Sequence, residues 1–139
     1  MRIKLRDKIF LNEKNVKTKL ASFIINNDKL SMGPKCLEFE KKFSKFQETK
    51  YSVMVNSGSS ANLLIFQTLI NMKKLKFGDL IAFSSLTWST NVMPLISLGF
   101  KLLPIDTNIG NFNIDINDFL KKIKKNKVKC LFVTNALRA

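Results

Sequence analysis

The chain contains no histidine and only two cysteines, Cys36 and Cys130, among its 139 residues. Structural and catalytic zinc sites draw most of their ligands from histidine and cysteine at short, regular spacings. These two cysteines lie far apart and have no such spacing. We therefore expect no metal site of ordinary composition, and we expect the two thiols to be buried or chemically idle.

Long apolar runs are also missing. None reaches the roughly 18 residues that a membrane-spanning helix requires, and residues 1–7 lack the apolar segment of a signal peptide. Hydrophobic residues nevertheless make up 45% of the chain, which is enough for one globular core. These features predict a cytoplasmic protein with no membrane partner.

Acidic residues are scarce: 10 aspartates and glutamates face 24 lysines and arginines, so the net charge is +14. Such a charge suits a polyanion partner, but the lysines are mostly spread along the chain and no aromatic residues interleave with them. The dense run at residues 121–127 ends a predicted helix, where lysines complement the helix dipole. We expect no nucleic-acid partner; a non-enzymatic, basic α/β module that binds a polyanion remains an alternative.

Hydrophobic spacing predicts an alternation of helices and short apolar strands. The order favours a parallel sheet with helices on both faces, a three-layer α/β/α architecture. The helix over residues 61–72 is apolar enough to be buried. The predicted helices span residues 12–26, 34–46, 61–72, 88–98 and 116–125, and the predicted strands span 52–55, 80–83, 101–105 and 128–133.

The junction after the first predicted strand carries the clearest functional signal. Small polar residues, Ser57 to Ser60, lie directly before the apolar helix. The first amides of a helix have no intrahelical acceptor and lie at the positive end of its dipole. Three serine hydroxyls add donors, and Gly58 lets the backbone approach a ligand closely. The pattern predicts a phosphate-binding turn.

The only tryptophan, Trp88, follows the second predicted strand in the segment Ser85-Leu86-Thr87-Trp88. An aromatic ring beside a phosphate-binding turn suits a planar, phosphorylated cofactor. A plain core tryptophan is the alternative.

The order and spacing of these segments resemble the DegT-type family of sugar-nucleotide aminotransferases and their dehydratase relatives, over about residues 10–135. The resemblance implies the N-terminal part of the large domain of a fold-type I transferase that depends on pyridoxal phosphate (PLP). It implies one incomplete domain over 1–139, with an N-terminal arm and helices over 1–50 and the start of the PLP-binding part over 51–139. The segments that carry it are Ser31–Pro34 with Phe39, Glu40 and Phe43, then Val55–Asn62, Ser85–Thr90, Gly99, Pro104–Asp106 and Asn113–Asp115.

The resemblance also implies the cofactor site. Pyridoxal 5'-phosphate or pyridoxamine 5'-phosphate would have its phosphate on Gly58, Ser59 and Ser60 and its ring against Trp88. In the family, the Schiff-base lysine, or the histidine that replaces it in dehydratases, and the aspartate that pairs with the ring nitrogen follow the strand that matches residues 131–134. No residue of this chain is therefore predicted to be catalytic.

Each of three further residues has two possible roles. Ser57 and Asn62 either join the cofactor site or only cap the helix. Asp106 ends a strand, where α/β sheets bind ligands, but an aspartate that forms a turn or caps a helix fits equally well.

For the whole enzyme, the resemblance implies transfer of an amine from glutamate to a keto sugar nucleotide, in lipopolysaccharide or other polysaccharide synthesis, by a homodimer. A keto-deoxysugar 3-dehydratase is the alternative, and three segments look closer to that branch: Met32–Pro34, Asn56–Leu64 and Trp88–Thr90. Arg138 stands where the family has a glycine after Asn135. We therefore expect an N-terminal fragment that is inactive alone.

Overall fold

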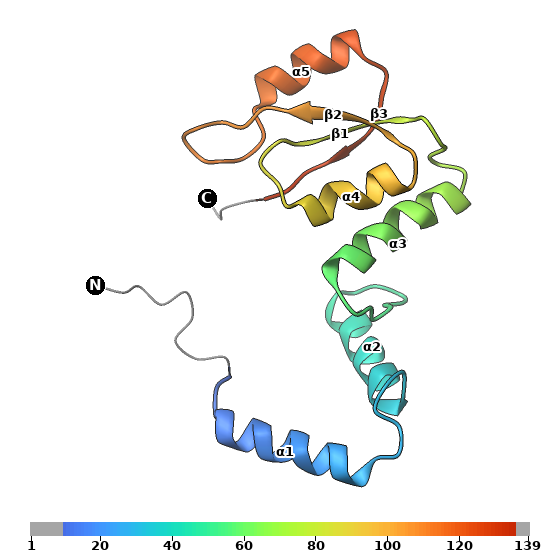
Figure 1. Ribbon diagram of the computed structural model, residues 1–139, viewed down its shortest axis with the longest axis vertical. Helices are drawn as coiled ribbons and strands as arrows, with labels where there is room; N and C mark the ends of the chain where they lie inside the picture. The colour runs from blue at the N-terminus through green and yellow to red at the C-terminus, as the bar shows by residue number, and fades with distance from the viewer. Residues whose placement is uncertain (1–9, 136–139) are drawn as a thin grey trace. The chain divides into compact units, whose positions relative to one another are not determined.

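The computed structural model describes residues 10–135 (Figure 1). The chain divides into two compact units, Met1–Met54 and Val55–Ala139. The predicted organisation as one incomplete domain stays a prediction, and Arg138 lies outside the described residues. Among the described helices, none combines the length and the apolar character that crossing a bilayer demands.

The first unit contains α1, Glu13–Asn26, and α2, Pro34–Phe46. Both predicted helices are confirmed. The helix α2 begins at Pro34 because the amide of a first-turn residue has no intrahelical acceptor, so its absence costs nothing, and because the proline ring fixes φ near the helical value. Phe39 and Phe43 stack on α2 with their ring centroids 5.6 Å apart.

The predicted strand at residues 52–55 is wrong. No ladder joins residues 51–55 to another strand of the described chain. A strand is held by its partner's hydrogen bonds, but the Met54 amide donates instead to the Glu40 carboxylate, at 2.8 Å. Tyr51 and Val53 remain 76% and 75% exposed, so no layer covers this segment.

The second unit is built on a parallel sheet of three strands in the order β2-β1-β3. These strands are β1, Leu80–Ser84, β2, Lys101–Ile105, and β3, Val128–Phe132. They confirm three of the four predicted strands. In the register, Ala82 of the central strand lies between Leu103 of β2 and Leu131 of β3.

Helices cover both faces of this sheet, which confirms the α/β class. Figure 1 shows α3 and α4 on one side and α5 on the other. The helix α3 begins three residues before the predicted helix because the Ser57 hydroxyl caps it, accepting the Ser60 amide at 3.2 Å. Their bounds are α3, Gly58–Asn71, α4, Ser89–Ser97, and α5, Ile116–Lys125.

The core lies between the sheet and the pair α3 and α4. Phe66 of α3 is 2% exposed and meets the rings of Phe100 and Phe132 edge to face, at centroid distances of 5.9 and 5.3 Å. Ile81 and Leu95 complete the contact and are fully buried. The predicted burial of the whole helix is wrong: only Phe66 of α3 is buried, because the small sheet covers one stripe of the helix.

Candidate cofactor-binding site

The three parallel strands place their carboxyl ends at one edge of the sheet, where α/β proteins bind ligands. Hydroxyl groups from different loops meet there. The side-chain oxygens of Ser85 and Thr107 lie 3.2 Å apart, and those of Thr87 and Thr134 lie 2.6 Å apart. Segments after β1, β2 and β3 are thereby joined into one polar rim.

The predicted phosphate-binding turn forms the N-terminus of α3. The amide of Ser60 is taken by the Ser57 hydroxyl at 3.2 Å, and that of Ala61 by the Ser57 carbonyl at 3.0 Å. Ser57 is therefore the helix cap, one of its two expected roles. Within residues 10–135, no acceptor is assigned to the amides of Gly58 and Ser59. These two amides are the donors that the helix start offers to an anion.

The space in front of Gly58 is open. Apart from its two chain neighbours and the backbone of its own helix, a Cβ atom built on Gly58 would meet no atom within 4 Å. Internal packing therefore does not require a glycine here, and a ligand can approach this stretch of backbone directly. Of the predicted phosphate ligands, Gly58 and Ser59 have amides with no assigned acceptor in the described chain, whereas the Ser60 amide is taken. The Ser60 hydroxyl lies 3.1 Å from the hydroxyl of Ser57.

Trp88 is the residue that caps α4 at its N-terminal end. Its side chain is 78% exposed, so it is not the plain core tryptophan of the alternative reading. Its carbonyl accepts the Asn91 amide at 2.9 Å, which fixes the backbone. The chain thus presents a large, flat, uncovered ring beside the first turn of α4.

A polar network that sequence reasoning missed connects the starts of α3 and α4. The Asn62 amide donates to the Asn91 side-chain carbonyl at 2.8 Å, and the Asn91 amide donates to the Thr87 hydroxyl at 2.9 Å. Asn62 is therefore occupied by this network and does not cap the helix. The partners are far apart in the sequence, and only the topology that packs α3 on α4 could have revealed them.

Asp106 serves the turn after β2. Its carboxylate accepts the Thr107 amide at 2.8 Å, and its own amide donates to the Asp118 carboxylate at 2.8 Å. This bond, with the nearby ammonium of Lys122, lowers the pKa of Asp118. These contacts favour the turn-forming role of Asp106.

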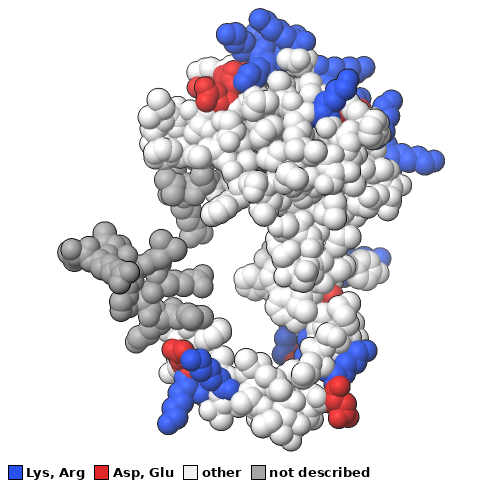
Figure 2. Space-filling view, viewed as in Figure 1, with Lys and Arg blue, Asp and Glu red and all other residues white. Residues whose placement is uncertain are grey.

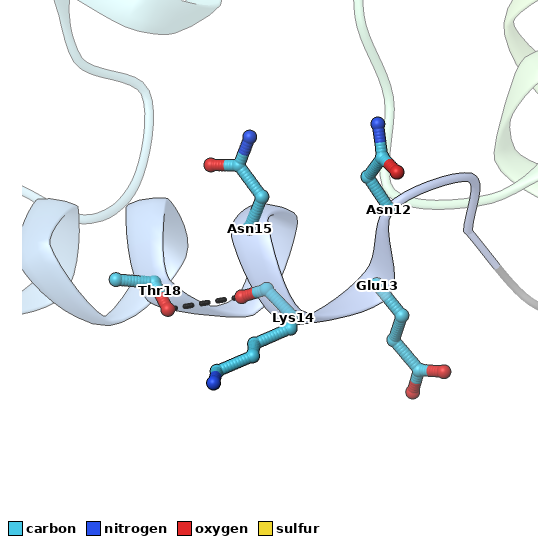
Figure 3. Close-up of a pocket in the computed structure, with 5 residues that line it drawn as sticks. All are labelled: Asn12, Glu13, Lys14, Asn15 and Thr18. Carbon is cyan, nitrogen blue, oxygen red and sulfur yellow. Dashed lines mark hydrogen bonds between the residues drawn. The ribbon is translucent and has the colours of Figure 1, made fainter.

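Two other surface features lie outside this site. Figure 2 shows lysines gathered over α5, where Lys124 and Lys125 are exposed in the last turn and Lys122 pairs with Asp118. A hollow along α1 is lined only by residues of that helix and its cap, and the Thr18 hydroxyl bonds to the carbonyl of Lys14 in its own helix (Figure 3). Because no second element contributes polar groups to it, we do not regard this hollow as a functional site.

Comparison with known proteins places this geometry in a family. The model of the DegT/DnrJ/EryC1/StrS aminotransferase family matches residues 12–136. The chain belongs to this family. Among curated members, a GDP-4-keto-6-deoxy-D-mannose 3-dehydratase of Yersinia pseudotuberculosis is 38% identical over 82% of this chain and 29% of its own length.

Solved structures of the family share the fold. A GDP-4-keto-6-deoxymannose-3-dehydratase mutant with bound GDP-perosamine superposes with a TM-score of 0.75 at 31% identity, covering 85% of this chain and 30% of that one. The Escherichia coli enzyme of that name, with bound hydrated PLP, gives 0.70 at 33% identity, covering 84% of this chain and 30% of that one. The predicted fold, the N-terminal part of a PLP-dependent transferase of this type, is confirmed. The chain spans about 30% of the length of these relatives.

Proposed function

We propose that this chain supplies the phosphate-binding turn and the ring-stacking residue of a PLP-dependent enzyme that acts on a keto sugar nucleotide. The observation that carries the proposal is the pair of amides at Gly58 and Ser59, at the start of α3, which have no assigned acceptor among residues 10–135; the space in front of Gly58 is open. An amide pair at the positive end of a helix suits a dianionic phosphate ester.

The residues fit the cofactor at both of its ends. The amides of Gly58 and Ser59 and the hydroxyl of Ser59 would hold the phosphate. The exposed ring of Trp88 would lie on the pyridine ring and limit its tilt, which is worth about 1 kcal/mol beyond area burial. When bound, PLP or its pyridoxamine form supplies the electron sink for bond breaking beside nitrogen. The chain's own described residues bind and orient this group, and none of them is assigned to proton transfer.

Dehydration at the 3-position of the sugar is the reaction that the relatives favour. The 38% identical relative and the solved structures at 31–33% identity are named as GDP-4-keto-6-deoxymannose 3-dehydratases. Transfer of an amine, from glutamate to the sugar ketone, is the second candidate; the name of the family supports it as far as aminotransfer. Either product would enter polysaccharide or lipopolysaccharide synthesis, and we place the enzyme in the cytoplasm as a homodimer.

One incubation separates the two reactions. The full-length protein is mixed with PLP, glutamate and GDP-4-keto-6-deoxymannose, and the sugar product is analysed by mass spectrometry and NMR. Loss of the 3-hydroxyl identifies the dehydratase, and a new amine at the ketone carbon identifies the aminotransferase. An unchanged sugar, from protein that is folded and loaded with PLP, contradicts this choice of substrate.

The role of Trp88 is tested separately by cofactor retention. Replacement Trp88→Ala removes the stacking surface, and we expect the Kd for PLP to rise about fivefold, from roughly 1 kcal/mol of lost stacking. Trp88→Phe keeps an aromatic face and is the matched control. Its Kd for PLP should lie between those of the wild type and Trp88→Ala. Equal affinity of the wild type and Trp88→Ala rules out the stacking role.

A further inference from the structure

We propose that Asn91 is a positioning residue, which sets the place of Trp88 relative to the phosphate-binding turn. The inference rests on the proposed function, because it assigns the geometry of that same site to a residue outside it. The Asn91 side chain contacts three other segments. Its carbonyl accepts the Asn62 amide of α3 at 2.8 Å, and its own amide donates to the hydroxyls of Thr87 at 2.9 Å and Thr134 at 3.4 Å.

The network supports both the phosphate-binding turn and Trp88 through neighbouring residues. On the side of α3, Asn62 lies four residues after Gly58, and so one helical turn from the free amides. On the side of α4, Asn91 binds Trp88 through the backbone and Thr87, the residue before it, through the side chain. The phosphate-binding turn and the tryptophan are therefore connected through the first turns of α3 and α4, which the Asn62–Asn91 bond joins.

Trp88 needs such support because little else holds it. With its ring 78% exposed, it has few packing contacts of its own. Thr87 is anchored a second time by Thr134, at 2.6 Å, and the Thr134 amide donates to the buried hydroxyl of Ser84 at 3.0 Å. The loop before α4 is thus fastened to the end of β3 as well as to α3, with Asn91 as the shared partner.

This arrangement predicts a selective defect. Without Asn91, the amides of Gly58 and Ser59 stay in place, because the Ser57 cap that starts α3 is untouched. The Trp88 loop, in contrast, loses its side-chain link to α3 and the bond between Thr87 and the Asn91 side chain, and keeps only the Asn91 backbone amide and Thr134 as partners. A ligand that contacts both the phosphate-binding turn and Trp88 should bind more weakly, whereas a ligand that contacts only the turn should bind as before.

The test compares two ligands on the full-length protein, PLP and inorganic phosphate as its competitor. For Asn91→Ala we expect the Kd of PLP to rise by up to about fivefold, the effect of losing the Trp88 stacking altogether, and the Kd of phosphate to change less than twofold. In protein without cofactor, acrylamide quenching of Trp88 should also change. Subtracting the emission of Trp88→Phe counterparts isolates the signal of Trp88.

The control is Gln67→Ala, which removes the Gln67–Asn71 bond of 3.0 Å on the exposed surface of α3, and it should alter the Kd of neither ligand. If Asn91→Ala does not fold, Asn62→Ala, which breaks only the bond to α3, decides the question by the same measurements. Unchanged PLP affinity and quenching, or equal losses for PLP and phosphate, overturn the positioning role alone. Failure of the folded wild type to bind PLP overturns the proposed function itself.

Discussion

Replacement of Gly58 by alanine should separate the stability of the fold from binding at the candidate site. The new methyl group would meet no protein atom within 4 Å, so it causes no clash in the structure. Gly58 is also the first residue of α3, and alanine in a helix is favoured over glycine by about 0.5–1 kcal/mol, with that range as an upper limit at a helix end. The variant should therefore be as stable as the wild type, or slightly more stable.

Binding should change in the opposite direction. The methyl group would occupy the open space through which a phosphate approaches the amides of Gly58 and Ser59. Loss of one charge-assisted hydrogen bond costs about 1.5–3 kcal/mol, so we expect the Kd of PLP to rise between about tenfold and a hundredfold. Urea unfolding measures the first effect, and equilibrium dialysis of PLP on full-length protein measures the second.

A second glycine supplies the control. Gly99 has φ of 74°, and a Cβ there would clash with the Phe77 ring. Gly99→Ala should therefore destabilise the fold by about 1 kcal/mol or more, while the folded molecules bind PLP with wild-type affinity. If Gly58→Ala binds PLP as tightly as the wild type, the space in front of α3 is not the phosphate site and the reasoning fails.

Two further substitutions test the fold that carries the site. Phe66→Ala should lower the free energy of unfolding by about 3–5 kcal/mol, because it empties the centre of the core, and a loss below 1 kcal/mol in urea unfolding contradicts that core. Asp118→Asn tests the pH dependence. Bonds from the Asp106 amide and Lys122 lower the folded-state pKa of Asp118. The contribution of Asp118 to stability is therefore complete above its unfolded-state pKa, near pH 4, and is lost as the pH falls through the lower folded-state pKa. The stability gap between the wild type and Asp118→Asn should thus shrink from pH 7 to pH 3, and a constant gap in unfolding midpoints opposes this account.

Local chemistry made much of this protein predictable. The helix from Pro34 begins at its proline, and Asp115 caps α5 by accepting the amides of Asn117 and Asp118 at 2.7 and 3.1 Å. The strands at residues 101–105 and 128–132 are short, largely apolar runs between turns, and both form because they pair with the central strand β1. The strand predicted at 52–55 failed for the complementary reason, because its apolar pattern found no partner in the described chain.

The sequence by itself determined the parallel α/β class, the family resemblance, and the turn and the tryptophan that mark the candidate site, because each depends on local patterns or on their order along the chain. Only the tertiary structure decided that the ring of Trp88 is uncovered, that the Ser60 amide is already used by its own cap, and that Asn91 joins α3 to the end of β3. Exposure and long-range hydrogen bonds depend on which elements pack together, and no local pattern encodes that.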